Sequence, residues 1–198
     1  YQRLEHNSGG AGGFAAAVER FLAGDHQWLW LLDDDALIEP DALRALMERA
    51  VDWDSVYWSV AVCLEKGCDE LCWPVAMLGQ SSKTITTTIA SHLPAIAETT
   101  NAPFLGMLLH RSLMERIGVP DRGFFISGDD AEYCHRIRRQ GGRILMVKAS
   151  RVRHPLPKRR SLRLLGHTIQ VLELAPWKRY YEIRNRLIIA KRYHGYRL

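Results

Sequence analysis

The stretch Trp28-Leu29-Trp30-Leu31-Leu32-Asp33-Asp34-Asp35 decides the fold of this chain. Its five consecutive large apolar residues predict a β-strand buried on both faces, as is typical of an α/β sheet. The three carboxylates that follow cannot share this burial without a cation or a water-filled cleft. Because ligands bind beyond the carboxyl ends of strands in open α/β sheets, the stretch predicts a site for a metal-bound, phosphate-bearing substrate.

The Asp triplet has a second interpretation, a solvated turn that leads into the next helix. That helix has its own start at Glu39-Pro40, which leaves the triplet unneeded as a cap. Asp33 and Asp35 alternate along the chain, so both can reach one divalent ion, while Asp34 points elsewhere or toward a sugar hydroxyl. Mg²⁺ or Mn²⁺ suits such oxygen ligands.

The charge is distributed unevenly along the 198 residues. Residues 1–150 carry 14 Lys and Arg against 20 Asp and Glu, whereas residues 151–198 carry 13 against 2, a balance of +11. Such a basic tail suits an anionic membrane surface, a lipid diphosphate or nucleic acid, and a merely solvated basic face is the alternative. The longest apolar runs fall far short of the roughly 18 residues that indicate a membrane span.

The four cysteines, Cys63, Cys68, Cys72 and Cys134, do not form paired C-x-x-C motifs. This spacing argues against a zinc site, and we expect reduced, mostly structural thiols of a cytosolic protein.

A glycine-rich segment, Asn7-Ser8-Gly9-Gly10-Ala11-Gly12-Gly13-Phe14, stands near the start of the chain. We expect a loop here, between a strand at residues 3–6 and a helix at residues 15–22. Its glycines would let the backbone approach a ligand closely. The segment matches neither standard phosphate-binding motif, and a plain tight turn fits it as well.

Apolar periodicity predicts most other elements. Residues 79–101 have no clear period and are expected to form a loop that could cover a substrate. The predicted elements are a helix at 42–50, a strand hairpin at 56–63 and 71–78, a strand at 104–109, a helix at 111–117, a helix at 129–140 and a strand at 143–148.

A second acidic cluster occurs in Phe124-Phe125-Ile126-Ser127-Gly128-Asp129-Asp130-Ala131-Glu132-Tyr133, where a predicted strand again ends in carboxylates. Ser127-x-x-Asp130 also fits a helix capping box, and Asp129 and Glu132 suit the positive end of the helix dipole. Both interpretations can hold together. A carboxylate at a helix start opposite a metal-bound cluster would be well placed as a general base.

The tail begins after the last predicted strand, where His154 stands just past the strand end. An isolated His is more often a surface residue than a metal ligand. Residues 176–193 predict a basic amphipathic helix suited to a membrane interface, with Tyr180, Ile183, Leu187, Ile188 and Ala190 along one side.

Together these pieces resemble family 2 glycosyltransferases of the GT-A fold, especially galactofuranosyltransferases and bacterial rhamnosyltransferases. Their order and spacing cover nearly the whole chain. The matching pieces are the glycine segment, Trp30-Leu31-Leu32-Asp33-Asp34-Asp35, Gly118-Val119-Pro120-Asp121 with the second acidic cluster, His154, and Tyr180-Tyr181-Glu182-Ile183-Arg184-Asn185.

The resemblance implies an α/β fold with a Rossmann-like central mixed sheet flanked by helices and a role for each candidate residue. Asp33, Asp35 and His154 would hold Mn²⁺ or Mg²⁺ on the nucleotide diphosphate. Asp130 would be the catalytic base, with Asp129 and Glu132 supporting it or holding the acceptor. The donor site would be bordered by Asp34 and by the glycines of the segment, Gly9, Gly10, Gly12 and Gly13.

The resemblance also sets the expected domain organisation. Residues 1–155 would form the catalytic domain. Residues 156–198 would form a basic, helical extension, whose charge and amphipathic helix suit association with a membrane. Family members usually begin with about two more strand-helix units, so we expect the first part of the nucleotide-binding half to be missing here.

The sequence therefore predicts a metal-assisted, inverting glycosyltransferase at the inner face of the cell membrane. Its donor would be UDP-galactofuranose or dTDP-rhamnose, and its acceptor a lipid-linked or polysaccharide hydroxyl. A nucleotidyltransferase is the alternative enzyme, but the glycine segment carries no basic residue for its donor loop. A non-catalytic module whose tail binds a membrane or nucleic acid is the alternative from another class; we expect no nucleic acid partner, because the acidic body would repel a polyanion.

Overall fold

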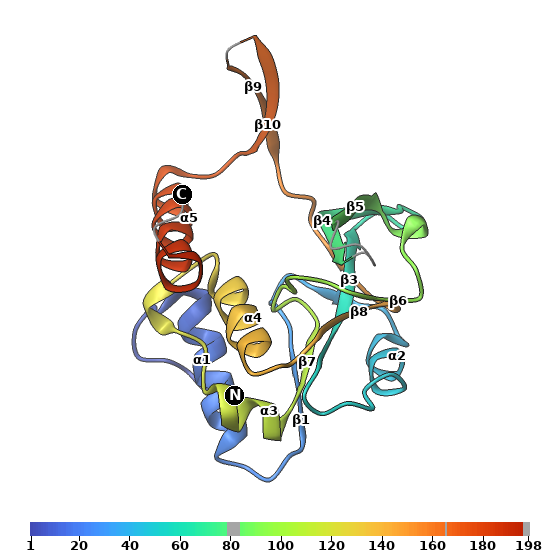
Figure 1. Ribbon diagram of the computed structural model, residues 1–198, viewed down its shortest axis with the longest axis vertical. Coiled ribbons are helices and arrows are strands. Elements are labelled where there is room, and N and C mark those ends of the chain that lie inside the picture. Colours follow the sequence, from blue (N-terminus) through green and yellow to red (C-terminus); the bar gives the residue numbers. More distant parts are fainter. Residues whose placement is uncertain (79–83, 165, 196–198) are drawn as a thin grey trace.

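The computed structural model describes residues 1–78, 84–164 and 166–195, which form a mixed sheet with helices on both of its sides. In Figure 1, α1, α3, α4 and α5 gather on one side of the strands and α2 lies on the other. The helices are α1 (Gly9–Leu22), α2 (Ala42–Met47), α3 (Arg111–Ile117), α4 (Asp129–Arg139) and α5 (Pro176–Ile189), with short helices η1 (Ala90–His92), η2 (Arg122–Phe124) and η3 (Ala190–His194). These elements confirm the predicted α/β class.

The sheet has the order β1-β7-β3-β4-β5, and β8 pairs with β3 in parallel and with β2 and β6 in antiparallel fashion. Since β7 is antiparallel to both β1 and β3, strands β1, β3 and β8 point the same way and their carboxyl ends share one edge. The strands are β1 (Trp28–Leu31), β2 (Leu37–Ile38), β3 (Val56–Cys63), β4 (Glu70–Leu78), β5 (Thr84–Ile89), β6 (Ile96–Glu98), β7 (Met107–His110) and β8 (Ile144–His154).

The main core lies between the sheet and the helices α1, α3 and α4. All eight residues of β3 are buried, as expected of a strand covered on both faces. The strand β1 is less buried than its apolar sequence predicts, and Trp28, Leu29 and Trp30 are only half-buried. The reason is its position, because among the described strands β1 pairs with β7 alone.

The glycine-rich segment forms the first turns of α1, so the prediction of a strand followed by a glycine loop is wrong. The glycines permit close packing instead. Gly9 has φ of +67°, and a Cβ there would lie 2.0 Å from the carbonyl oxygen of Phe125. The amide of Ala11 donates to that same oxygen at 3.1 Å. These contacts outweigh the modest helix propensity of glycine.

Two further stretches differ from the predictions. Residues 84–98 contain β5, η1 and β6 rather than an irregular loop, since β5 pairs with β4 and β6 with β8; residues 79–83 of the predicted loop lie outside the described part of the chain. Residues 122–127 form η2 and a turn in which Phe125 and Ser127 have φ near +65°, a conformation that no strand adopts. Apolar character alone predicted a strand there.

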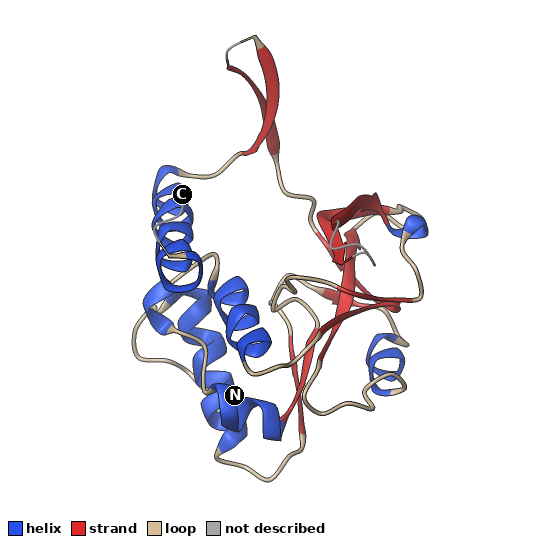
Figure 2. Ribbon diagram, in the orientation of Figure 1, coloured by secondary structure: helices blue, strands red, loops and turns tan. Residues whose placement is uncertain are grey.

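The tail contains a β-hairpin that the prediction of a helical extension did not include. Strands β9 (Arg159–Leu164) and β10 (His167–Leu172) pair only with each other among the described strands, and the hairpin projects away from the rest of the molecule (Figure 2). The predicted helix is present as α5 and η3. No helix in the described part of the chain is long and apolar enough to cross a membrane.

The cysteines also differ from the expectation. A disulfide joins Cys63 to Cys68, because the turn after β3 brings their Cα atoms to 6.1 Å, a distance that a disulfide spans. The prediction of reduced thiols is wrong for this pair, whereas Cys72 and Cys134 are free and buried.

Candidate active site

The Asp triplet directly follows β1 at the edge where β1, β3 and β8 end. His154, the last residue of β8, reaches the same edge, and its Nε2 lies 3.2 Å from Oδ1 of Asp35. The pKa of Asp33 is raised, first by loss of hydration and then by the charges of Asp35 and Asp34, while His154 opposes the shift. The topology therefore brings the three predicted metal ligands into one neighbourhood.

The ligands do not form a closed triad. Within the described residues, no three His, Cys, Asp or Glu side chains converge closely enough to hold a metal ion. The pair of Asp35 and His154 nevertheless has a donor set that fits one. Nδ1 of His154 lies 2.7 Å from the carbonyl oxygen of Pro155, a partner that can only accept. Because Nδ1 donates there, Nε2 is the ring nitrogen that faces the Asp35 carboxylate, and a divalent cation between the two would have one nitrogen and one oxygen ligand.

The second acidic cluster begins α4. Gly128 is the N-cap residue, with φ of +82° and no side chain to cap the helix, so the predicted capping box from Ser127 to Asp130 does not form. Instead Oδ1 of Asp130 accepts a hydrogen bond from the amide of Ala131 at 2.7 Å. Ser127 and Gly128 both have positive φ, and this conformation turns the chain so that Asp129 and Asp130 start the helix.

The pKa values of Asp129 and Asp130 are both raised above the ordinary value of an Asp side chain. Burial raises the pKa of Asp129 to about 6, against the opposing effect of backbone amides. The pKa of Asp130 is raised to about 7, first by burial and then by the charge of Asp129, with the Ala131 amide lowering it. A carboxyl group that titrates near neutral pH can accept a proton and release it again.

A cavity of about 520 Å³ joins the two clusters, a volume that suits a small organic ligand. Asp33 from the end of β1 and Asp129 and Asp130 from α4 all line it. Its walls combine aromatic and polar side chains, including Trp58, Trp73, Asn101 and Ser127. The cavity therefore places the end of β1 opposite the start of α4.

The four glycines predicted to border the donor site point in different directions, because they lie in the helix α1. Gly10 lines the cavity, whereas Gly13 lines a separate hollow on another face of α1. Gly9 packs on Phe125, and Gly12 packs on the side chain of Ser8. Asp34 is exposed and is not part of the cavity wall.

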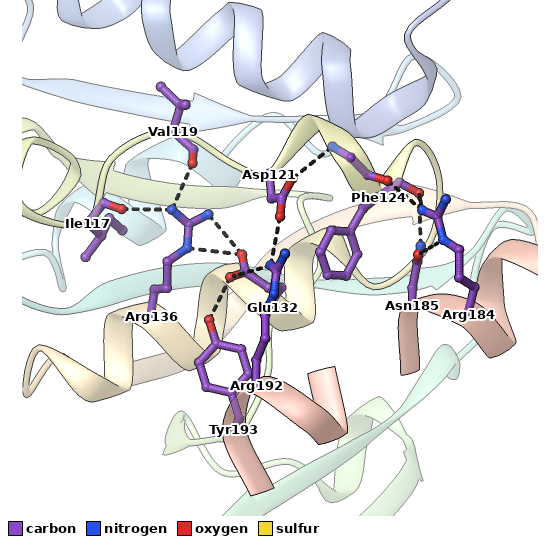
Figure 3. Close-up of polar contacts among 11 residues, drawn as sticks. Ile117, Val119, Asp121, Phe124, Glu132, Arg136, Arg184, Asn185, Arg192 and Tyr193 are labelled. Carbon is purple, nitrogen blue, oxygen red and sulfur yellow. Dashed lines mark hydrogen bonds and ion pairs between the residues drawn. The ribbon is translucent and has the colours of Figure 1, made fainter. Parts of the chain in front are cut away.

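Glu132 is buried and does not line the cavity. Figure 3 shows its polar contacts. Its Oε2 accepts from Nε of Arg136 at 3.0 Å, and its Oε1 accepts from the hydroxyl of Tyr193 at 2.6 Å. Arg136 also donates to two backbone carbonyls before α4. The structure therefore does not bring Glu132 together with the other predicted site residues, and its oxygens serve to join η3 to α4.

Two residues that line the cavity, Trp73 and Trp58, were not predicted from the sequence. Trp73 lines the cavity and its ring centroid lies 5.0 Å from that of His154. The apolar sequence of β4 predicted a strand, but it contained no indication of a cavity. Trp58 also lines the cavity, with its indole nitrogen donating to Thr99 at 3.1 Å.

Comparison with known proteins supplies relatives for this arrangement. A family model described as "Glycosyltransferase like family 2" matches residues 3–168. Galactofuranosyltransferase GlfT1 of Mycobacterium tuberculosis is 34% identical over 147 residues, which cover 71% of this chain and 47% of that protein. GlfT1 of Mycolicibacterium smegmatis is 30% identical over 150 residues, with coverage of 71% and 48%. The chain thus spans about half the length of the curated relatives it matches.

A solved structure shares the fold. The crystal structure of GalNAc-T7 with UDP, GalNAc and Mn²⁺ superimposes with a TM-score of 0.65 over 96% of this chain and 36% of that one. The sequence identity is 16%, so the likeness concerns the fold alone.

Proposed function

The chain belongs to glycosyltransferase family 2, and from this premise we propose that it moves a sugar from a nucleoside diphosphate donor to an acceptor hydroxyl. The observation that carries the proposal is the cavity in which Asp33 faces Asp129 and Asp130. UDP-galactofuranose is the favoured donor, because the curated relatives are galactofuranosyltransferases, and dTDP-rhamnose is the second choice. The acceptor would be a glycan or a lipid-linked sugar.

The proposed reaction is a single in-line displacement that inverts the anomeric centre. The acceptor oxygen forms a bond to the anomeric carbon, the bond from that carbon to the diphosphate breaks, and Asp130 takes the hydroxyl proton. The raised pKa of Asp130 suits this task, since a carboxylate with a pKa of about 7 is a stronger base than an ordinary one. Asp129 would orient the acceptor or support the base.

Asp33, Asp35 and His154 would hold a divalent cation, Mn²⁺ or Mg²⁺. Such an ion, when bound, neutralises the charge that grows on the departing diphosphate. The Nε2 of His154 that faces the Asp35 carboxylate supports this assignment. Gly10, which borders the cavity on the α1 side, would lie beside the donor.

We also propose that the tail rests on the inner face of the cell membrane. Four large side chains of α5, at helical spacing, are more than half exposed: Trp177 (51%), Tyr180 (61%), Ile183 (54%) and Leu187 (53%). Together with the +11 charge of residues 151–198, this apolar face suits an anionic lipid surface. Binding to vesicles that contain anionic lipid, but not to neutral ones, is expected in a flotation assay; recovery in the vesicle-free fraction at low salt would contradict it.

The transfer itself is tested with Asp130→Ala in an assay that follows sugar transfer from UDP-galactofuranose and dTDP-rhamnose in the presence of Mn²⁺. We expect turnover to fall at least about a hundredfold, the effect of losing a general base, with donor binding largely kept. Asp25→Ala is the matched control, because Asp25 is exposed in the connection between α1 and β1. Equal turnover in the two variants would refute the role of Asp130.

A further inference from the structure

Helix α5 buries a polar side chain and leaves its large apolar ones exposed. Among its residues, all of which the structure describes, Asn185 alone is buried, with 1% of its surface exposed. A buried amide has a large desolvation cost and so needs several partners. Its position therefore points to a specific task at the contact between α5 and the turn that precedes α4.

Asn185 makes three hydrogen bonds to that turn, and Figure 3 shows the one to Phe124. Its Nδ2 donates to the carbonyl oxygens of Phe124 at 3.0 Å, Ile126 at 2.9 Å and Ser127 at 2.6 Å, with one of its two hydrogens shared between two acceptors. Since carbonyls can only accept, the amide orientation is fixed. Nε of Arg184 donates to Oδ1 of Asn185 at 2.9 Å, so the remaining end of the amide is also held.

The turn needs such support because its backbone is strained. Phe125 has φ of 63° and ψ of −62°, and Ser127 has φ of 66°, conformations that residues with a Cβ seldom adopt. On its other side, the carbonyl of Phe125 accepts from the amide of Ala11 in α1. The turn is therefore clamped between α1 and α5.

The same turn carries the acidic cluster. Residues 126–130 all line the cavity, so the carbonyls that Asn185 binds and the carboxylate of Asp130 belong to one short segment. A Cβ at Gly128 would lie 3.5 Å from the Cβ of Asn185, so α5 is packed directly against the residue that begins α4. A shift of Asn185 would thus move the start of α4 relative to the end of β1.

We propose that Asn185 is a positioning residue, whose three hydrogen bonds hold the turn at residues 124–128 so that Asp130 faces the anomeric carbon of the bound donor. The inference rests on the proposed sugar transfer. Asn185 does not line the cavity. It acts on the rate of the chemical step by fixing the direction of Asp130, and it leaves the donor site at the end of β1 unchanged.

The test is Asn185→Leu, which keeps a similar volume and removes the hydrogen-bond donors. Gln140→Leu is the control, since it removes an exposed amide at the other end of α4. For Asn185→Leu we expect kcat for sugar transfer to fall at least about tenfold, because small misplacements of a catalytic group are costly, while KM for the donor stays within about twofold. Amide hydrogen exchange at residues 124–130 should accelerate at least about tenfold, with the paired strands β3 and β8 unaffected.

Other results would overturn the inference. An unchanged kcat would show that the turn does not need Asn185 for catalysis, and unchanged exchange at residues 124–130 would show that Asn185 does not hold the turn. Faster exchange throughout β3 and β8 would make Asn185 a residue of general stability. A wild-type protein that transfers no sugar would refute the proposed function instead, and the exchange comparison would still decide whether Asn185 holds the turn.

Discussion

The rate of sugar transfer should depend on pH through Asp130. Its pKa of about 7 in the folded protein means that about one molecule in ten carries the required carboxylate at pH 6, and about nine in ten at pH 8. Below pH 7, kcat/KM should therefore fall about tenfold for each pH unit. The assay is transfer from UDP-galactofuranose at constant ionic strength and saturating Mn²⁺, between pH 5 and pH 8.5.

The cause of the raised pKa of Asp130 suggests a second experiment, the substitution of Asp129. After burial, the charge of Asp129 is the largest contribution that raises the pKa of Asp130. Asp129→Asn removes this charge at constant volume, so the acid limb of its profile should move to lower pH even if the variant turns over slowly. Two results would refute the assignment of Asp130 as the base. One is a kcat/KM that does not change between pH 5.5 and pH 8, and the other is a fall in kcat/KM at acid pH that occurs at the same pH in Asp129→Asn as in wild type.

The same shift affects stability. Because the pKa of Asp130 is higher in the folded protein than its ordinary value of 3.8, the folded state binds this proton more tightly than the unfolded state. The resulting contribution to stability is complete below about pH 4 and is lost as the pH rises through about 7. Urea denaturation across this window should show a larger decline for wild type than for Asp130→Asn, because the variant keeps only the contribution of Asp129, whose pKa is raised to about 6.

Three substitutions of residues that do not line the cavity test the fold. Arg111→Ala should lower the unfolding free energy by about 2 kcal/mol in urea denaturation, since its guanidinium donates to four backbone carbonyls at and after the end of α1. Gly106→Ala should cost at least about 2 kcal/mol by the same measurement, because Gly106 has φ of +95° and a new Cβ would lie 2.6 Å from that of Ser59. Tyr193→Phe should cost about 1 kcal/mol, as it removes the hydrogen bond to Glu132. Wild-type stability in any of these variants would contradict the corresponding contact.

Local signals in the sequence predicted much of the fold. The helix at residues 111–117 matches α3 to the residue, and the helix at 129–140 matches α4 within one residue. Both have apolar periodicity and end at glycines, as local rules require. The strands at 56–63 and 71–78 were found in the same way.

The remaining elements depend on contacts between distant residues, which local patterns do not contain. The strand β5, with its run of threonines, is defined by pairing with β4, and the turn at Phe125 by the amide of Ala11 and the side chain of Asn185. The glycines of α1 suggested a loop because their close packing on Phe125 is visible only in three dimensions.

The candidate site, like the fold, could be predicted from the sequence only in part. Charge at strand and helix ends predicted Asp33, Asp129 and Asp130, which the structure places around one cavity. The sequence could not tell which carboxylates find other partners. Glu132 stands in the same acidic run as Asp130, yet its partners Arg136 and Tyr193 engage both of its oxygens.

The central claim, that the cavity between β1 and α4 binds a nucleoside diphosphate with a divalent ion, is tested most directly by calorimetric titration of UDP. The titration is made with and without Mn²⁺, on wild type, Asp33→Ala and the control Asp25→Ala. The account predicts binding that requires Mn²⁺, persists in Asp25→Ala and weakens at least about tenfold in Asp33→Ala. UDP binding of equal strength in all three proteins, or binding indifferent to Mn²⁺, would contradict it.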